Sequence, residues 1–357
     1  MDQTTLKLAN STASAQLAVF GNDLADPSDF LFGFELSDLT IDCNLAGTGA
    51  NATAHAVALS GRLIRIDRVR AIGFGTKDAA HPCEVFSVGR AHVKNPVPPF
   101  GCVMSECRVE GLSSSHASGA LAVGFSLYGK EESNGVMARH EGSVVRDSYI
   151  DGTSSGNNFQ AFAITGAAGT IVERNLARNC KYGVVVTCLA SSPPISVLSS
   201  KDIVIKENVF TSVAQGFLLT ATNLHQIGRV IIERNLIELD SNAIAGVQCT
   251  PNSTPSSVPD ILIARWNSIR PAAGISLPAG TLGLSLDTCG QVIAEYNIVN
   301  VPNPDNAVKV RAPLQGETVS TFDAQTDEAR FLQAYNPLNG KHLTEFTTEV
   351  ENVLLAL

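Results

Sequence analysis

The sequence predicts an all-β fold, a right-handed parallel β-helix of about nine coils followed by a C-terminal helical segment. Two observations lead to this prediction: short apolar segments recur at nearly constant spacing, and the clearest of them share an asparagine at the same place. We expect residues 1–34 to form a strand-rich coil or cap, 35–312 the β-helix, and 313–357 a helical cap or tail.

The repeat is clearest in the second half of the chain, where five segments align without gaps. Each has an asparagine at its sixth place, and successive asparagines are separated by 33, 27, 32 and 30 residues. In coils stacked about 4.8 Å apart, equivalent side chains lie over one another, so inward positions must be apolar and similar in size. An asparagine at a bend can turn inward, bond to the backbone and stack on the next amide. The segments are TIVERNLA (170–177), IVIKENVF (203–210), VIIERNLI (230–237), LIARWNSI (262–269) and VIAEYNIV (292–299), with Asn175, Asn208, Asn235, Asn267 and Asn297.

Weaker copies extend the same frame toward the N-terminus. A second apolar run, such as AFAIT (161–165) or GFLLT (216–220), follows most segments. Short strands with no helical period between them fit a coil better than a βαβ unit. The weaker copies are LTIDCNLA (39–46), IRIDRVRA (64–71), CVMSECRV (102–109) and SVVRDSYI (143–150), which place Asn44, Val69, Cys107 and Ser148 on the asparagine ladder.

The place two residues before the ladder asparagine is expected to point outward. Its charge alternates in sign from coil to coil, which avoids stacking like charges. We interpret this column as a solvated ion ladder, in which each exposed pair stabilises the protein by only about 0–1 kcal/mol. The column consists of Glu173, Lys206, Glu233, Arg265 and Glu295.

After the last repeat an amphipathic pattern replaces the strand pattern. A helix over 341–357 and a shorter one beginning near Thr326 are expected. Because a solenoid needs its open end covered, we interpret this part as a cap or as a helix packed on the wall. Self-association through the helix is the alternative. Its apolar face consists of Leu343, Phe346, Val350, Val353, Leu354 and Leu357.

Composition narrows the class of partner. Apolar residues make up 44% of the chain and charged residues 17%, and the net charge of −9 argues against nucleic acid as the main partner. No apolar run approaches the roughly 18 residues of a membrane-spanning helix. The first residues lack the pattern of a signal peptide. We expect a secreted or cell-surface protein whose leader is missing from this sequence; a cytoplasmic or phage-encoded chain is the alternative.

The eight cysteines are scattered along the chain and include no CxxC pair. We interpret them as small buried hydrophobic residues. The alternative is one or two disulfides, either Cys180–Cys188 or Cys102–Cys107.

The ladder of x-I-x-x-N-x-I coils resembles the pectate-lyase-like (pectin lyase-like) superfamily of right-handed β-helices over most of the chain. The resemblance implies a polysaccharide lyase, glycoside hydrolase, esterase, epimerase or phage tailspike that binds an extended glycan along one wall. The polygalacturonase-type motifs (Asn-Thr-Asp, Asp-Asp, His-Gly, Arg-Ile-Lys) are absent as a set, although Asp202 and Lys206 stand in KDIVIK. The arginine motif of the calcium-dependent pectate lyases is not recognisable.

The expected function is therefore that of a carbohydrate-active protein, a polysaccharide lyase or glycoside hydrolase acting on a polysaccharide or oligosaccharide. The first alternative is a glycan-binding or tailspike-like adhesion protein without turnover, and the second is a structural β-helix. The chain is expected to be a monomer or a homotrimer. Calcium is the candidate cofactor.

The first candidate site is a pair of aspartates, Asp42 and Asp67, which the frame puts at equivalent places in neighbouring coils. Two carboxylates about 5 Å apart would raise one pKa, bind a divalent cation or suit a retaining glycosidase. Arg65 and Arg146 are alternative partners that would neutralise them, and Arg146 is also a candidate for substrate binding.

The second candidate site is the insertion over 128–143, because long loops on a solenoid wall commonly carry function. His140 and Glu141 are the expected base and acid. Arg139 or Lys130 would hold a uronate carboxylate, and Tyr128 is a further candidate for substrate binding. The alternative is a solvated loop without a role.

The third candidate is aromatic. Trp266 and Tyr296 each precede the ladder asparagine in successive coils, so they are expected to stack and form a platform for a sugar. Packing beneath the C-terminal helix is the alternative. Loops flanking the second coil carry further candidates that could enlarge the aspartate site. The alternative is that they are surface residues without a role. They are His55, Asp78, His81 and Glu84.

Overall fold

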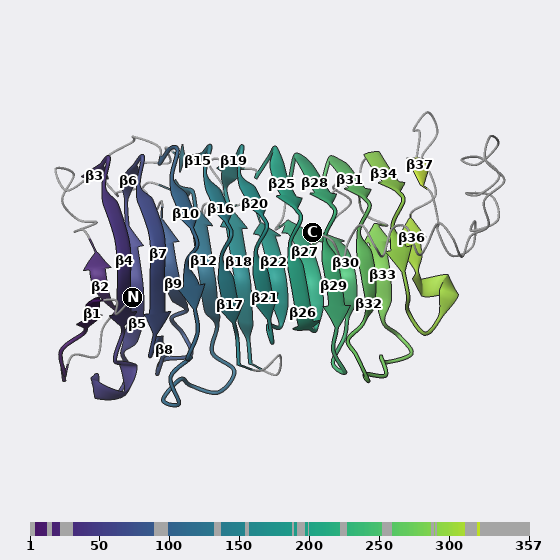
Figure 1. The fold of residues 1–357 in the computed structure, drawn as a ribbon. Coiled ribbons are helices and arrows are strands. Elements are labelled where there is room, and N and C mark those ends of the chain that lie inside the picture. The colour runs from purple at the N-terminus through teal and green to yellow at the C-terminus, as the bar shows by residue number, and fades with distance from the viewer. Residues whose placement is uncertain are drawn as a thin grey trace.

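The computed structural model is a right-handed parallel β-helix, drawn in Figure 1 as an elongated stack of coils. It describes residues 4–12, 16–21, 31–88, 99–131, 137–153, 157–187, 189–190, 197–198, 200–221, 227–251, 259–286, 289, 291–310 and 320–321. Within these residues the regular elements are strands and two short 3₁₀ turns, η2 (Leu45–Gly47) and η3 (Pro304–Asn306).

Two long sheets form the walls, and we call them sheet A and sheet B. Sheet A consists of β1 (Thr4–Lys7), β4 (Glu35–Asp42), β7 (Arg65–Ile72), β10 (Val103–Ser105), β11 (Arg108–Val109), β16 (Val144–Arg146), β17 (Tyr149–Asp151), β20 (Ile171–Glu173), β21 (Leu176–Arg178), β25 (Ile203–Lys206), β26 (Val209–Val213), β28 (Arg229–Glu233), β29 (Leu236–Leu239), β31 (Ile261–Arg265), β32 (Ser268–Pro271), β34 (Gln291–Glu295), β35 (Ile298–Val299) and β37 (Ser320–Thr321). Sheet B consists of β2 (Gln16–Gly21), β5 (Thr53–Leu59), β8 (Gly75–Thr76), β9 (Cys83–Val88), β12 (Ala122–Tyr128), β18 (Phe159–Thr165), β22 (Tyr182–Thr187), β27 (Gln215–Ala221), β30 (Ala245–Pro251), β33 (Leu282–Leu286) and β36 (Val308–Val310). Small pairs join β3 (Leu31–Phe32) to β6 (Gly61–Arg62), β13 (Lys130–Glu131) to β14 (Met137–Ala138), β15 (His140–Glu141) to β19 (Ala167–Ala168), and β23 (Leu189–Ala190) to β24 (Val197–Leu198).

Each coil crosses sheet A, bends within it, and returns through sheet B. The bend is made by one residue in the left-handed region, with φ between 52° and 58°, directly before the ladder position. A side chain at that residue points outward, and the next one points into the core. The bend residues are Asp38, Arg68, Glu106, Asp147, Arg174, Glu207, Arg234, Trp266 and Tyr296.

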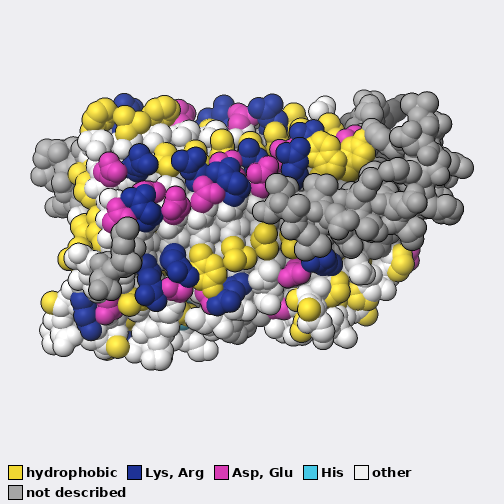
Figure 2. Space-filling view, in the orientation of Figure 1, with side chains coloured by type: hydrophobic (Ala, Val, Ile, Leu, Met, Phe, Trp, Pro, Cys, Tyr) yellow, Lys and Arg dark blue, Asp and Glu magenta, His cyan; other side chains and the backbone are white. Residues whose placement is uncertain are grey.

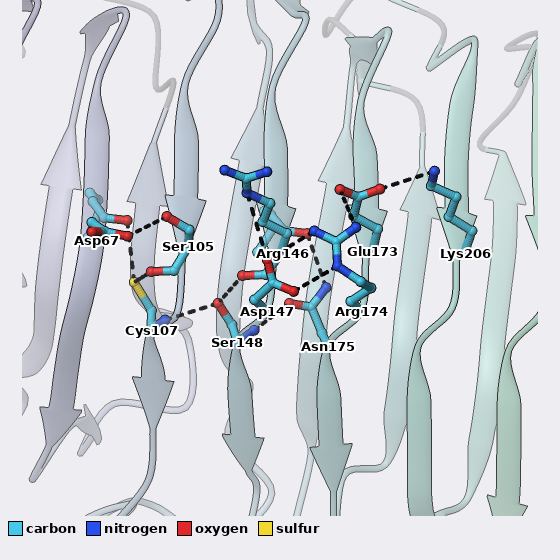
Figure 3. Close-up of polar contacts among 12 residues, drawn as sticks. Asp67, Ser105, Cys107, Arg146, Asp147, Ser148, Glu173, Arg174, Asn175 and Lys206 are labelled. Carbon is cyan, nitrogen blue, oxygen red and sulfur yellow. Dashed lines mark hydrogen bonds and ion pairs between the residues drawn. The ribbon is translucent and has the colours of Figure 1, made fainter. Parts of the chain in front are cut away.

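The asparagine ladder is confirmed. The side-chain Nδ2 of Asn175 donates to Oδ1 of Asn208 at 3.0 Å, and the same bond repeats to Asn297 at 2.9–3.0 Å. Ser148 continues the ladder upstream: its backbone N–H donates to Asn175 and its hydroxyl accepts from the backbone of Cys107 (Figure 3). The register places Leu39 and Val69 before Cys107, so in the described residues nine coils carry this position between Leu39 and Asn297, and Thr4 of β1 pairs with Leu39.

The core between the sheets is built of stacked apolar columns. Phe86, Phe125 and Phe162 lie in successive coils with ring centres 5.2 and 5.6 Å apart. Glycines in sheet B let the walls approach closely: a Cβ on Gly216 would lie 2.8 Å from the side chain of Ile237 on sheet A. Continuous columns of this kind stabilise each coil through its neighbours rather than through its own contacts.

The seven described cysteines are buried and form no disulfide with one another, as the first interpretation held. The alternative, a Cys102–Cys107 disulfide, is therefore wrong; burial raises the pKa of the Cys107 thiol to about 12. Cys180 is a free buried thiol, and Cys188 lies outside the described residues.

The ends of the chain are only partly described. Strands β1 and β2 pair with β4 and β5, so the first residues continue both sheets. The helices expected near Thr326 and over 341–357 lie outside the described residues, and the division into three parts stays a prediction. Among the described residues no helix is long and apolar enough to span a bilayer.

Candidate functional site

The outer surface of sheet A carries two rows of charge that run along the coil axis (Figure 2). The first is the predicted ion ladder, which is confirmed by pairs between Glu173 and Lys206 at 3.2 Å and between Glu233 and Arg265 at 2.8 Å. These groups neutralise one another, which leaves this row no unopposed charge between Glu173 and Arg265.

The second row consists of the bend residues and was missed by the sequence analysis. Arg174 binds both carboxylate oxygens of Asp147, at 2.8 and 3.0 Å (Figure 3). Arg68 binds Asp38 in the same way at 2.6 and 2.7 Å, and these bonds hold the pKa of Asp38 below its usual value. The signal was present in the sequence, because the residue before each ladder position is charged in seven successive coils, from Asp38 to Arg234.

The expected pairing of Asp42 with Asp67 is wrong. The register of β4 and β7 places Ser37 opposite Asp67 and Ile72 opposite Asp42, a shift of five residues from the sequence frame. The frame failed because Asn44 is not a ladder residue: its side chain bonds the backbone of Leu8 instead. The inferences that rested on this pair, a raised pKa, a divalent-cation site and a retaining glycosidase, lose their geometric basis.

Each aspartate has its own partners. Asp42 lies 3.4 Å from Lys7 and accepts the backbone N–H of Asn44 at 2.9 Å. Asp67 is only 4% exposed and accepts the hydroxyl of Ser105 at 2.6 Å (Figure 3). Arg68 also binds its carboxylate. Asp67 is thus a satisfied buried carboxylate.

Arg65 and Arg146 do not neutralise this pair. Arg65 lies opposite Val103 in the next coil, and Arg146 lies opposite Ser105 and Glu173. The Nε atom of Arg146 is 3.8 Å from a carboxylate oxygen of Asp147.

The 128–143 insertion does not form the expected acid–base pair. His140 is fully buried and hydrogen-bonded to Ser143, and burial lowers its pKa to about 4. Glu141, the next residue of β15, is exposed. Adjacent strand residues point to opposite faces, so the imidazole lies inside the coil and cannot reach a ligand that Glu141 contacts.

For the other candidate residues of the insertion, the structure gives burial and backbone pairing. Arg139 is half-buried, and its Nε has no hydrogen-bond partner among the described residues. Tyr128 is half-buried at the end of β12, and the backbone of Lys130 pairs with Ala138. Their roles in substrate binding stay predictions.

The residues flanking the second coil divide between separate places. His81 and Asp78 bind each other at 2.6 Å. His55 and Glu84 are buried on sheet B, where Ser87 donates to Glu84 at 2.7 Å. Because Asp42 and Asp67 belong to sheet A, these residues do not enlarge an aspartate site. Within the described ranges, no group of three His, Cys, Asp or Glu side chains could hold a metal ion.

The aromatic pair is confirmed as a stack. The rings of Trp266 and Tyr296 lie 5.6 Å apart at an angle of 18°. The guanidinium groups of Arg265 and Arg234 lie 4.7 and 5.2 Å from the Trp266 ring. Trp266 is 39% exposed, and the nearby Ile293 and Ile298 are each 38% exposed. We call Trp266, Tyr296, Ile293 and Ile298 the apolar patch.

A second aromatic cluster, also missed by the sequence analysis, surrounds Tyr149. Arg108 from the preceding coil and Arg178 from the following coil lie 5.2 and 5.3 Å from its ring. Arg178 also binds Asp151 at 2.8 Å. Burial and the charge of Asp151 raise the pKa of Tyr149, so the phenol is neutral at ordinary pH. We call Arg108, Tyr149, Asp151 and Arg178 the Tyr149 cluster.

Comparisons with known proteins add little to this geometry. No protein-family model matches the sequence, and no curated protein matches it either. Among solved structures, the chain is similar to the Azotobacter vinelandii mannuronan C-5 epimerase AlgE6 A-module, with 14% identity over 88% of this chain and 92% of that one and a TM-score of 0.35. At that identity and score the likeness carries no functional inference for this chain.

Proposed function

We propose that this β-helix is a carbohydrate-binding protein that holds an extended glycan against the outer surface of sheet A. The observation that carries the proposal is the exposed stack of Trp266 and Tyr296 with arginine beside it. Sugars present C–H faces and hydroxyl groups together, and they are bound by aromatic rings with hydrogen-bond donors at their rims.

The backbone at these two positions strengthens the proposal. The left-handed conformation disfavours bulky side chains. Seven upstream coils fill it with Asp, Glu or Arg, six of which form the cross-coil pairs Arg68–Asp38, Arg174–Asp147 and Arg234–Glu207. Among the described bends, Trp266 and Tyr296 alone place aromatic rings there, where they cannot enter the core. A cluster of exposed apolar side chains that the fold does not bury is typical of a binding site.

The test is binding to a panel of plant, algal and bacterial polysaccharides, followed by calorimetry on any that bind. Trp266→Ala is expected to weaken binding by at least about tenfold, since a buried aromatic contact contributes roughly 1.5 kcal/mol or more. Phe32→Ala is the matched control, because Phe32 is an exposed aromatic outside sheet A and its loss should leave binding unchanged.

Two outcomes contradict the proposal. One is no binding to any polysaccharide in the panel. The other is association of the chain with itself that depends on concentration and is lost in Trp266→Ala, because the apolar patch would then hold a second copy.

Turnover is the second candidate function, and the Tyr149 cluster favours it. The phenol of Tyr149 lies beside a carboxylate and two guanidinium groups, so it is suited to donate a hydrogen bond to a glycosidic oxygen, and Arg108 is suited to hold a carboxylate of an acidic sugar. Ultraviolet absorbance of an unsaturated product would reveal a lyase, and new reducing ends a hydrolase. If Tyr149→Phe keeps full activity, the cluster is not the site of reaction.

A further inference from the structure

We infer that the apolar patch and the Tyr149 cluster are two ends of one binding surface, so that the ligand is a linear glycan long enough to span the coils between them. This inference rests on the proposed function and adds to it the length of glycan that the surface selects. It is carried by the register of sheet A and by the side chains that fill the intervening coils.

The register fixes the distance between the two ends. Tyr149 pairs in turn with Leu176, Val209, Leu236 and Ser268. Trp266 lies two residues before Ser268, so four coil steps separate the Tyr149 cluster from the aromatic pair. At about 4.8 Å a step this is roughly 19 Å along the coil axis.

The coils between them form a continuous amphipathic strip. The row that begins at Tyr149 continues with Leu176, which is 40% exposed, and with the half-buried Val209 and Leu236. The bend residues of the same coils form the opposite row: Arg174, Glu207 and Arg234.

Between these two rows the ladder side chains turn inward, so the surface there is backbone. Figure 2 shows part of the band, with charged side chains along one side and apolar side chains along the other, where Arg108 and Arg178 flank Tyr149. A chain of sugars lying in the band would place C–H groups on the apolar row and hydroxyl groups on the charged row.

The backbone of the band favours a glycan over a peptide. Its N–H groups are already used between coils, as in the bonds from Val209 to Asn175, Leu236 to Asn208 and Ser268 to Asn235 at 2.8–2.9 Å. A peptide that binds by strand addition needs unpaired backbone groups at a sheet edge. The described face of the band offers side-chain donors and apolar contacts instead.

Both ends offer guanidinium groups beside an aromatic ring, Arg108 at Tyr149 and Arg234 at Trp266. These groups donate to hydroxyl or carboxylate oxygens of a sugar. Neutral cello-oligosaccharides and acidic oligogalacturonates are therefore used as two series of probes, together with oligosaccharides of any polysaccharide that binds in the panel.

The experiment measures affinity against oligosaccharide length, from disaccharide to octasaccharide, for the natural chain and two variants. Tyr149→Leu keeps the apolar row, because Leu occupies the same position in the next coil. Affinity is expected to rise by roughly tenfold or more once the chain covers both ends, since the second contact is then intramolecular. Tyr149→Leu should remove that rise and leave short oligosaccharides unaffected, whereas Trp266→Ala should weaken binding at every length.

The outcomes separate this inference from the proposed function. Binding that is lost in Trp266→Ala but does not depend on length, or a Tyr149→Leu effect equal at every length, overturns the inference and leaves the proposed function standing. No binding to any polysaccharide overturns both. Phe32→Ala again serves as the matched control, and melting temperatures of all variants verify that they fold.

Discussion

The side-chain amide of Asn208 donates to the side-chain oxygen of Asn235 in the next coil at 3.0 Å, and Asn208 is itself fully buried. The same amide also donates to the carbonyls of Val172 and Lys206, while its oxygen accepts from Asn175. One side chain thus satisfies groups of three coils, so the ladder connects neighbouring coils as well as filling a bend.

Replacing this residue should be costly. Asn208→Ala removes the acceptor of the buried backbone N–H of Asn175 and the side-chain donor to the carbonyl of Val172, and a buried group left unsatisfied costs about 1–3 kcal/mol. We expect the free energy of unfolding to fall by about 2–4 kcal/mol in denaturant titrations. Asn300→Ala is the control, because Asn300 is exposed and should change stability by less than about 0.5 kcal/mol. Equal losses in the two variants would show that the ladder contributes nothing.

At a left-handed bend residue, substitution by valine and substitution by glycine are expected to change the stability of the protein in opposite directions. Glu207 has φ 57° and its ion pair with Arg234 is 3.5 Å long. A β-branched side chain is strongly disfavoured there, so Glu207→Val should destabilise the protein by about 1–2 kcal/mol, while Glu207→Gly should be neutral or stabilise it by up to about 1 kcal/mol. Thermal unfolding measures both. A Val variant as stable as the Gly variant would contradict the bend geometry.

Asp151 of the Tyr149 cluster should make the free energy of unfolding depend on pH in the acid range. Partial burial raises the pKa of Asp151, but hydrogen bonds from Asn179, Thr153 and Arg178 outweigh it and hold that pKa below 3.8. The folded state therefore binds this proton less readily than the unfolded state. The stabilisation is complete above about pH 4 and is lost as the pH falls through the lowered pKa. Unfolding followed from pH 6 downward, to about pH 2, should show a shallower loss in Asp151→Asn; an unchanged slope would sink this prediction.

The buried thiols should be unreactive. Burial raises the pKa of Cys43, Cys83, Cys102, Cys107 and Cys180, and only thiolates react readily with disulfide reagents. In a titration with an aromatic disulfide, the seven described thiols are expected to react only after denaturation. Fast reaction of several thiols in the native protein would contradict the burial of these columns.

The sequence was sufficient for the coils whose inward residues repeat. Asn175 through Asn297 were placed correctly because stacking forces the same residue into the same bend. Cys107 and Ser148 were also placed correctly, since both are small enough to point inward at that position. Leu39 was missed because Asn44 mimics a ladder residue while it bonds Leu8 and Asn10.

The candidate site was harder to predict, because it depends on register and on which face a side chain takes. His140 had the chemistry of a base, but its strand pairs with β19 and turns the ring into the core. Tyr149 was overlooked because Arg108 and Arg178 come from different coils and meet only after stacking. Trp266 and Tyr296 were found because they share one position in successive coils.

Trp266 is the single tryptophan of the chain, so its fluorescence reports directly on whether a glycan binds at sheet A. Its fluorescence is titrated with a glycan whose binding calorimetry has established. If the glycan lies on sheet A, it displaces water from Trp266, and the emission should change with the same affinity that calorimetry gives. Saturable binding without any change in tryptophan emission would place the glycan elsewhere and contradict its binding to the outer surface of sheet A.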